Sequence, residues 1–135
     1  MKITLIAISL IITSALRAQM DSLPSGVWNE LVVKKTSKGE SRPVFDRPSS
    51  MFPRFEVHAT TLHAGEESHP PHSHRAEEIM LLMKGTITMN IASVNYKAVT
   101  GDVIFVRPDV LHNLKNTGNE PCWYYAIKWF NEVYN

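Results

Sequence analysis

The chain has 135 residues, of which 44% are hydrophobic, and its formal net charge at pH 7 is +1. This length and apolar fraction suit a single domain with one core. Basic residues are scattered among acidic ones, so the sequence has neither the basic stripe of a nucleic-acid-binding protein nor the acidic block of a disordered tail.

The first 18 residues have the pattern of a secretory signal peptide. Lys2 gives a positive start, and residues 3–16 are apolar apart from Thr and Ser. This run is shorter than the roughly 20 residues that cross a bilayer. We predict cleavage after Ala18, with cleavage after Ala15 as the competing site and an uncleaved N-terminal anchor as the alternative. The mature chain is therefore expected to be exported, either periplasmic or secreted, and not to be held by a membrane.

Residues 19–53 are interpreted as an N-terminal arm that precedes the main domain, residues 54–135. Residues 27–33, with the sequence VWNELVV, predict a short edge strand. Residues 34–42 are polar and turn-like, and the segment after them is interpreted as irregular because it contains Pro43, Pro48 and Pro53. We expect the arm to pack on a sheet edge, and we expect a homodimer in which residues 27–33 are lent to the partner chain.

A strand predicted over residues 55–63 leads into the stretch around which the chain is organised, residues 69–85, with the sequence HPPHSHRAEEIMLLMKG. Pro70 and Pro71 exclude a helix at its start, because neither donates a backbone hydrogen bond and both clash with a preceding turn. The residues that follow are therefore interpreted at the period of a strand.

At that period His72 and His74 point to the same face. A turn over residues 75–77 would return the chain antiparallel and place Glu78 opposite the two histidines. Two imidazoles and a carboxylate that converge on one point are a typical set of metal ligands. Met80 and Leu82 have the same parity as Glu78, so we expect them to line the interior beside the metal.

Short strands continue to the end of the chain. They are predicted at residues 79–85, 86–91, 96–99, 103–106 and 123–130, with a hairpin turn over residues 92–95. Turn signals recur roughly every eight to twelve residues and no long helix is predicted, which is the pattern of an all-β sandwich or barrel. Cys122, the single cysteine, cannot form an intramolecular disulfide and is interpreted as a small core residue.

A later segment completes the ligand set. A Gly-Asp turn at residues 101–102 opens an apolar strand, and a Pro-Asp turn at residues 108–109 ends it and presents His112 at the start of the next strand. The predicted ligands of one divalent transition metal ion are His72, His74, Glu78 and His112. Manganese, iron, nickel, copper and zinc all accept such a set, which leaves one or two positions for water or substrate. A closed structural zinc site is not indicated, because such sites are usually rich in cysteine.

In these two segments the sequence resembles the cupin family. The first cupin motif is similar at Gly65, His72, His74, Glu78 and Gly85, and the second at Gly101, His112 and Asn116. Six residues rather than five separate Gly65 from His72, and Arg107 and Asp109 replace a proline and a glycine of the second motif. These differences fall in turns. The resemblance implies a double-stranded β-helix, the cupin jelly-roll barrel, and Asn116 is expected to orient the imidazoles from behind the ligands.

Two classes of function follow. In the first, the protein is a small metal-dependent enzyme that acts on a small oxygenated molecule as a dioxygenase, isomerase or aminohydrolase, with Glu78 as general base, as the resemblance to cupin dioxygenases implies. In the second, it is a non-catalytic module that binds a sugar or an organic acid. Export argues against a cytoplasmic transcription regulator, and no stretch is left over for a DNA-binding module.

Overall fold

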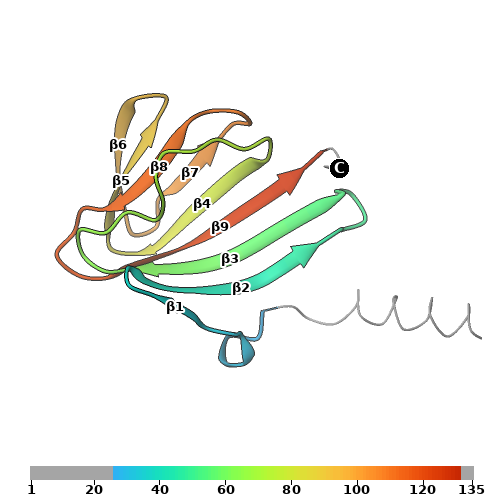
Figure 1. Ribbon diagram of the computed structural model, residues 1–135, viewed down its shortest axis with the longest axis horizontal. Helices are drawn as coiled ribbons and strands as arrows, with labels where there is room; N and C mark the ends of the chain where they lie inside the picture. Colours follow the sequence, from blue (N-terminus) through green and yellow to red (C-terminus); the bar gives the residue numbers. More distant parts are fainter. Residues whose placement is uncertain (1–25, 132–135) are drawn as a thin grey trace, which may run out of the picture.

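The computed structural model describes residues 26–131, in which nine strands form two antiparallel sheets that face each other (Figure 1). The strands are β1 (Lys34–Thr36), β2 (Gly39–Arg47), β3 (Arg54–Leu62), β4 (Glu77–Lys84), β5 (Thr86–Ile91), β6 (Val94–Val99), β7 (Val103–Val106), β8 (His112–Asn116) and β9 (Cys122–Phe130). The predicted all-β architecture is confirmed. The predicted signal peptide lies outside the described residues. Among the described residues, no helix is long and apolar enough to cross a membrane.

The larger sheet has the strand order β1-β2-β3-β9-β4-β7, and the smaller has the order β6-β5-β8. In β4, the side chains of Glu78, Met80 and Leu82 are buried while their neighbours are half-buried or exposed. The same three side chains were predicted to share one face of the strand. Ile87 and Met89 from β5 pack against this inner face, and each such fully buried apolar side chain contributes about 1.5–3 kcal/mol to folding.

Close packing fixes the end of β4. A Cβ atom on Gly85 would lie 2.6 Å from Cβ of Cys122, and the backbone there has a φ of +103°. Only glycine fits this position without strain. Cys122 is fully buried in the core cluster, as predicted for it.

The arm differs from its prediction. Residues 27–33 do not form a strand; Trp28–Glu30 are a single turn of 3-10 helix, and the Trp28 ring packs 5.6 Å from the Trp123 ring, centroid to centroid. The Arg42 guanidinium also lies over the Trp28 ring, 4.6 Å from its centroid. These aromatic contacts outweigh the β propensity of the valines on either side.

Residues 34–47, predicted to be turn-like and irregular, form β1 and β2. Strand β3 provides a partner along the whole length of β2. The ladder shifts register between Pro43 and Phe45, so the missing N–H of Pro43 falls at a bulge, where a proline is tolerated.

Candidate metal centre

The two histidines of the first motif lie on a loop rather than on a strand. The loop is nevertheless tied to β8, because His72 and His112 exchange backbone hydrogen bonds of 3.0 and 2.8 Å. The N–H of Asp109 donates to the carbonyl of His74 at 2.8 Å. A single bridge thus replaces the predicted ladder, and it still brings His72 and His112 side by side.

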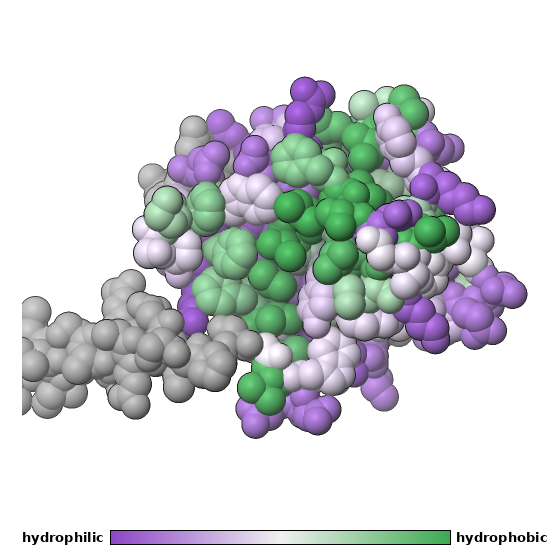
Figure 2. Space-filling model, turned by 180° about the vertical axis from the view of Figure 1, so that it is seen from behind, coloured by the Kyte–Doolittle hydropathy of each residue, from purple (hydrophilic) through white to green (hydrophobic). Residues whose placement is uncertain are grey.

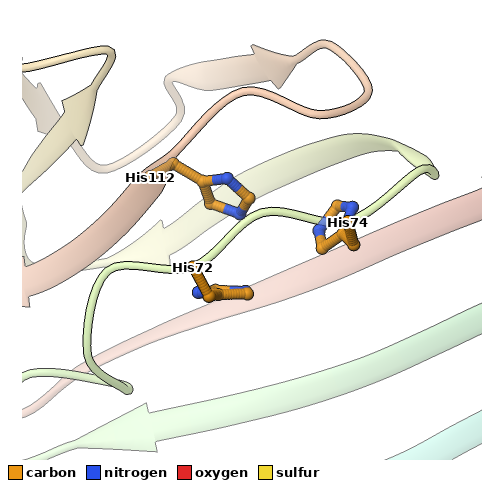
Figure 3. Close-up of side chains that lie close together, drawn as sticks. All are labelled: His72, His74 and His112. Atoms are coloured by element: carbon orange, nitrogen blue, oxygen red, sulfur yellow. The ribbon is translucent and has the colours of Figure 1, made fainter.

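The three imidazoles face a common space, as Figure 3 shows. One ring nitrogen from each of His72, His74 and His112 lies within 4.8 Å of the other two. Glu78 reaches the same place from β4, with Oε2 2.9 Å from Nε2 of His74 and 3.3 Å from Nε2 of His112. The structure therefore brings the three predicted imidazoles together and places Glu78 against two of them, His74 and His112.

Backbone carbonyls determine which nitrogen of two imidazoles carries the proton. Nδ1 of His74 lies 3.1 Å from the carbonyl oxygen of Ala76, and Nδ1 of His112 lies 2.8 Å from that of Val110. A carbonyl only accepts, so both Nδ1 atoms are the donors, and in the neutral imidazole each Nε2 is left with a lone pair.

Those two lone pairs point at a carboxylate, which also carries lone pairs. The arrangement is repulsive unless a proton or a cation lies between the imidazoles and Glu78. Moreover, Nε2 of His112 is buried and not aligned for a hydrogen bond with any described residue, and such orphaned nitrogens are rare in folded proteins. A divalent transition ion fits this donor set, because it would take up both imidazole lone pairs and the carboxylate charge.

The charges of the cluster support the same interpretation. Burial disfavours the ionised form of Glu78, but protons shared with the facing nitrogens of His112 and His74 outweigh burial and hold the pKa of Glu78 below its ordinary value. Burial also lowers the pKa of His72, and the neighbouring His112 lowers it further. Burial acts on His112 in the same direction, but the facing Glu78 carboxylate outweighs it and raises the pKa of His112. Metal ligation would need all three imidazoles to be neutral beside an ionised Glu78.

Asn116 does not have its predicted role. Its Nδ2 donates to the carbonyls of Leu62, His63 and Glu120 at 3.0, 3.1 and 2.9 Å, and it contacts no imidazole of the cluster. The carbonyls of Ala76 and Val110 orient the imidazoles instead. Through these hydrogen bonds Asn116 connects β8 to the end of β3 and to the loop before β9.

A small cavity opens beside the cluster. The residues on its wall that the sequence did not indicate as part of the site include His58, His69, Tyr124 and Lys128. Met80 lines the cavity as predicted, whereas Leu82 is buried in the core away from it. The cavity continues into a wider, open groove over β1, β2 and β3, with His58, His69 and Tyr124 at the junction. Alternation along β3 and β9 would have placed His58, Tyr124 and Lys128 inside, but only once the register between the two strands was known.

His69 touches the cluster from the cavity side without joining it. Its ring meets the His72 ring edge to face at a centroid distance of 4.5 Å. Burial lowers the pKa of His69 to about 4, so this imidazole is neutral near pH 7. It therefore forms an uncharged part of the wall.

Comparison with known proteins identifies the fold. Residues 58–128 match the family model described as "Cupin domain". A search of the curated proteins finds no match. An RmlC-like cupin from Shewanella frigidimarina is 16% identical and superposes with a TM-score of 0.66, covering 80% of this chain and 91% of its own. A Cupin 2 conserved barrel domain protein from Salinispora arenicola is 22% identical, with a TM-score of 0.60 and coverage of 73% and 81%. CapF, in complex with the inhibitor 3-isopropenyl-tropolone, is 17% identical, with a TM-score of 0.61, and the match covers 78% of this chain but 31% of CapF.

Proposed function

The chain belongs to the cupin domain family, and from this premise we propose that it is a metal-dependent enzyme acting on a small oxygenated molecule, of the dioxygenase, isomerase or aminohydrolase type. The metal would be one divalent transition ion on His72, His74, Glu78 and His112. The observation that carries the proposal is the pair of imidazole lone pairs that face the Glu78 carboxylate. When bound, such an ion supplies a Lewis acid that polarises a substrate oxygen.

The residues around the metal would exclude water, transfer a proton and admit the substrate. Met80, Met89 and Tyr124 exclude water from the cavity side of the cluster. Glu78 would accept a proton from the substrate at a carboxylate oxygen and return it later, which is the part of a general base. The open groove would admit the substrate, and the CapF complex is an instance of a related fold that holds a small organic molecule.

One observation favours a second function, a binding module without turnover. The pKa of Glu78 is held below its ordinary value, and a weaker base removes a proton less readily. In this case the metal and the cavity would hold a sugar or an organic acid unchanged.

Metal content tests the site. We expect one ion per chain in the wild type and less than one tenth of that in the double variant His72→Ala with His74→Ala, measured by elemental analysis after gel filtration. Asn95→Ala, on exposed β6, is a matched control that should keep the ion. Equal metal content in the double variant and the wild type would contradict the site.

The variant Glu78→Gln separates the two functions. Gln keeps the shape and one coordinating oxygen but cannot accept a proton. At saturating metal, an enzyme with Glu78 as base should lose roughly 10²–10⁴-fold in turnover of a panel of sugars, keto acids, phenols and organic acids, followed by oxygen uptake and mass spectrometry. Metal-loaded wild type that binds a panel member tightly yet leaves it unchanged would favour the binding module.

We further propose that the protein is exported and forms a homodimer. The motivation for export is the Lys2 start and the apolar run of residues 3–16. N-terminal sequencing of the protein from its native host should find a chain that begins near Gln19. A chain with intact Met1 in the cytosol would contradict export.

A further inference from the structure

A lysine lies beside the histidine cluster inside the barrel. The register of the large sheet places Glu56 on β3, Lys128 on β9 and Glu78 on β4 in one row, with Lys128 between the two carboxylates. The Lys128 side chain is only 17% exposed and lines the same cavity as His72 and His112. Lysine is almost never buried to this degree without a partner, so its position needs a reason.

Glu56 holds Lys128 in place. Its Oε1 accepts from Nζ of Lys128 at 2.9 Å and from Nδ1 of His58 at 3.0 Å. Its Oε2 accepts from Arg54 at 3.1 Å. The hydrogen bond from His58 is the largest influence and, with Lys128, lowers the pKa of Glu56 to about 2, so this carboxylate remains charged.

Lys128 and His58 keep donor and acceptor capacity on the cavity side. An ammonium has three N–H groups, and Glu56 is the one partner of Nζ within the described part of the chain. His58 uses Nδ1 toward Glu56, which leaves Nε2 for a ligand, and its ring lines both the cavity and the groove. Both side chains are thus oriented by one carboxylate and available to a bound molecule.

The charges around the cavity do not cancel once the metal is present. Arg54 is neutralised by Asp46, which binds it through both oxygens at 2.7 and 2.9 Å. The remaining charges are the positive charge of Lys128 and the negative charges of Glu56 and Glu78, which give a net charge of minus one. A divalent ion on the cluster turns this net charge of minus one into plus one. A ligand with a single negative charge would balance it.

We propose that Lys128 binds the carboxylate of a small organic acid whose remaining part extends from the cluster into the groove, where Nε2 of His58 accepts a hydrogen bond from a hydroxyl of the ligand. The proposal rests on the metal-dependent function above. It names the ligand class as a small monocarboxylic acid. The groove suits a hydroxylated remainder, because its lining includes the hydroxyls of Ser41, Thr60 and Thr61.

Matched ligands test this directly. The probes are glycolate, lactate and pyruvate, each paired with its amide, which has the same shape without the charge. Dissociation constants are measured by calorimetry or by ligand-observed NMR on purified protein of known metal content. We expect the wild type with metal to bind the acids at least 10-fold more tightly than the amides, and the metal-free protein to lose this preference.

Lys128→Met should weaken acid binding about 10–100-fold and leave amide binding unchanged, since it removes one charge-assisted hydrogen bond. Lys128→Arg should restore part of the preference. Lys97→Met, on exposed β6 of the other sheet, makes the same change at a distance and should have no effect. Glu56 keeps Arg54 and His58 in the Lys128→Met variant, so the fold should survive, and thermal unfolding checks this.

The outcomes separate this proposal from the metal-dependent function. Metal-loaded wild type that binds acids and amides equally, or binds none of the acids, overturns the role of Lys128, and this comparison needs no variant. An unchanged acid preference in folded Lys128→Met overturns it as well. Wild type with no bound metal would instead overturn the proposed function itself.

Discussion

Two glutamates in one row of the large sheet have opposite surroundings. Glu56 accepts hydrogen bonds from Lys128, His58 and Arg54 and is fully satisfied by the chain. Glu78 faces the lone pairs of two imidazoles and is satisfied only when a proton or an ion lies between them. The first carboxylate therefore contributes to stability, and the second is the one that we propose as a metal ligand.

Removing the Glu56 charge should cost stability in a pH-dependent way. The folded pKa of Glu56 is about 2, against 4.5 for the ordinary group, so its contribution is present above about pH 4.5 and is lost as the pH falls toward 2. Glu56→Gln should lower the free energy of unfolding by about 3 kcal/mol at pH 7, measured by urea denaturation. The difference from the wild type should shrink between pH 5 and pH 3; a constant difference would contradict the assignment.

Metal should leave the cluster as the pH falls. Ligation needs unprotonated nitrogens on His72, His74 and His112, and free imidazole titrates near ~6.5. We expect stoichiometric metal at pH 8 and progressive loss below about pH 6, with the midpoint lower for a tightly bound ion. Equilibrium dialysis against a weak chelator, followed by elemental analysis, measures this. Metal retention that is flat from pH 8 to pH 4 would rule out imidazole ligands.

At the scale of elements, Asn116 connects segments that are far apart in the chain. Its fully buried amide donates to carbonyls at the end of β3 and in the loop before β9. Asn116→Ala leaves these carbonyls unsatisfied and should cost about 3 kcal/mol in chemical denaturation. Asn95→Ala, on exposed β6, should stay within about 0.5 kcal/mol.

The same variant tests what Asn116 does for the metal. Because it contacts no imidazole, folded Asn116→Ala under native conditions should still hold one ion per chain. A variant that loses metal while keeping its stability would restore the imidazole-orienting role.

Sequence pattern predicted the elements that have strong local signals. Alternation along β4 placed Glu78 and Met80 inside, and the Pro-Asp turn placed His112 at the start of β8. Pro70 and Pro71 excluded a helix, but a period of two does not distinguish a paired strand from an extended loop, so the segment with His72 was predicted as a strand. Motif spacing along the chain was enough to predict that His72, His74 and His112 lie close together, although the strand pairing predicted for His72 and His74 was wrong.

Other parts needed information that a local pattern does not hold. Strand β2 is polar and contains Pro43, and this segment becomes a strand because it pairs with β3. The sequence pattern did not predict Lys128 as a cavity residue, for a related reason. Its place beside Glu78 depends on the register between β9 and β4, which pairs these two residues across 50 positions in the sequence.

At the scale of the whole molecule, the large sheet carries many apolar side chains on its outer face as well as in the core. The residues of β9 that alternate with its buried ones are Trp123, Tyr125, Ile127 and Trp129, and Ile79 and Leu81 lie beside them on β4. Figure 2 shows apolar side chains gathered over the side of the molecule that faces away from the view of Figure 1. A sheet with one face in water normally alternates apolar with polar residues, so this outer face is suited to being covered.

We propose a second copy of the chain as the partner that covers this outer face. Glu77 and Lys84 lie near opposite ends of β4, and Glu40 and Arg47 lie near opposite ends of β2. A two-fold axis across the strands would set each acidic end against a basic end of the partner. The net charge of +1 adds little repulsion between copies. This interface replaces the lent strand at residues 27–33, which is not a strand.

Charge placed in the middle of the outer face should therefore separate the two copies. Ile127 is half-buried in the single chain, so Ile127→Glu should leave the monomer folded while a carboxylate in the interface core would be left unpaired. We expect light scattering on the chain from residue 19 to give a dimer for the wild type and a monomer for Ile127→Glu. Val94→Glu, at a 51% exposed position on β6, makes the same change outside the face and should remain dimeric. A buried unpaired charge costs several kcal/mol and should raise the dissociation constant of the dimer by more than about 100-fold. A wild type that is monomeric at about 100 μM, or an Ile127→Glu variant that stays dimeric, would therefore exclude this face as the interface.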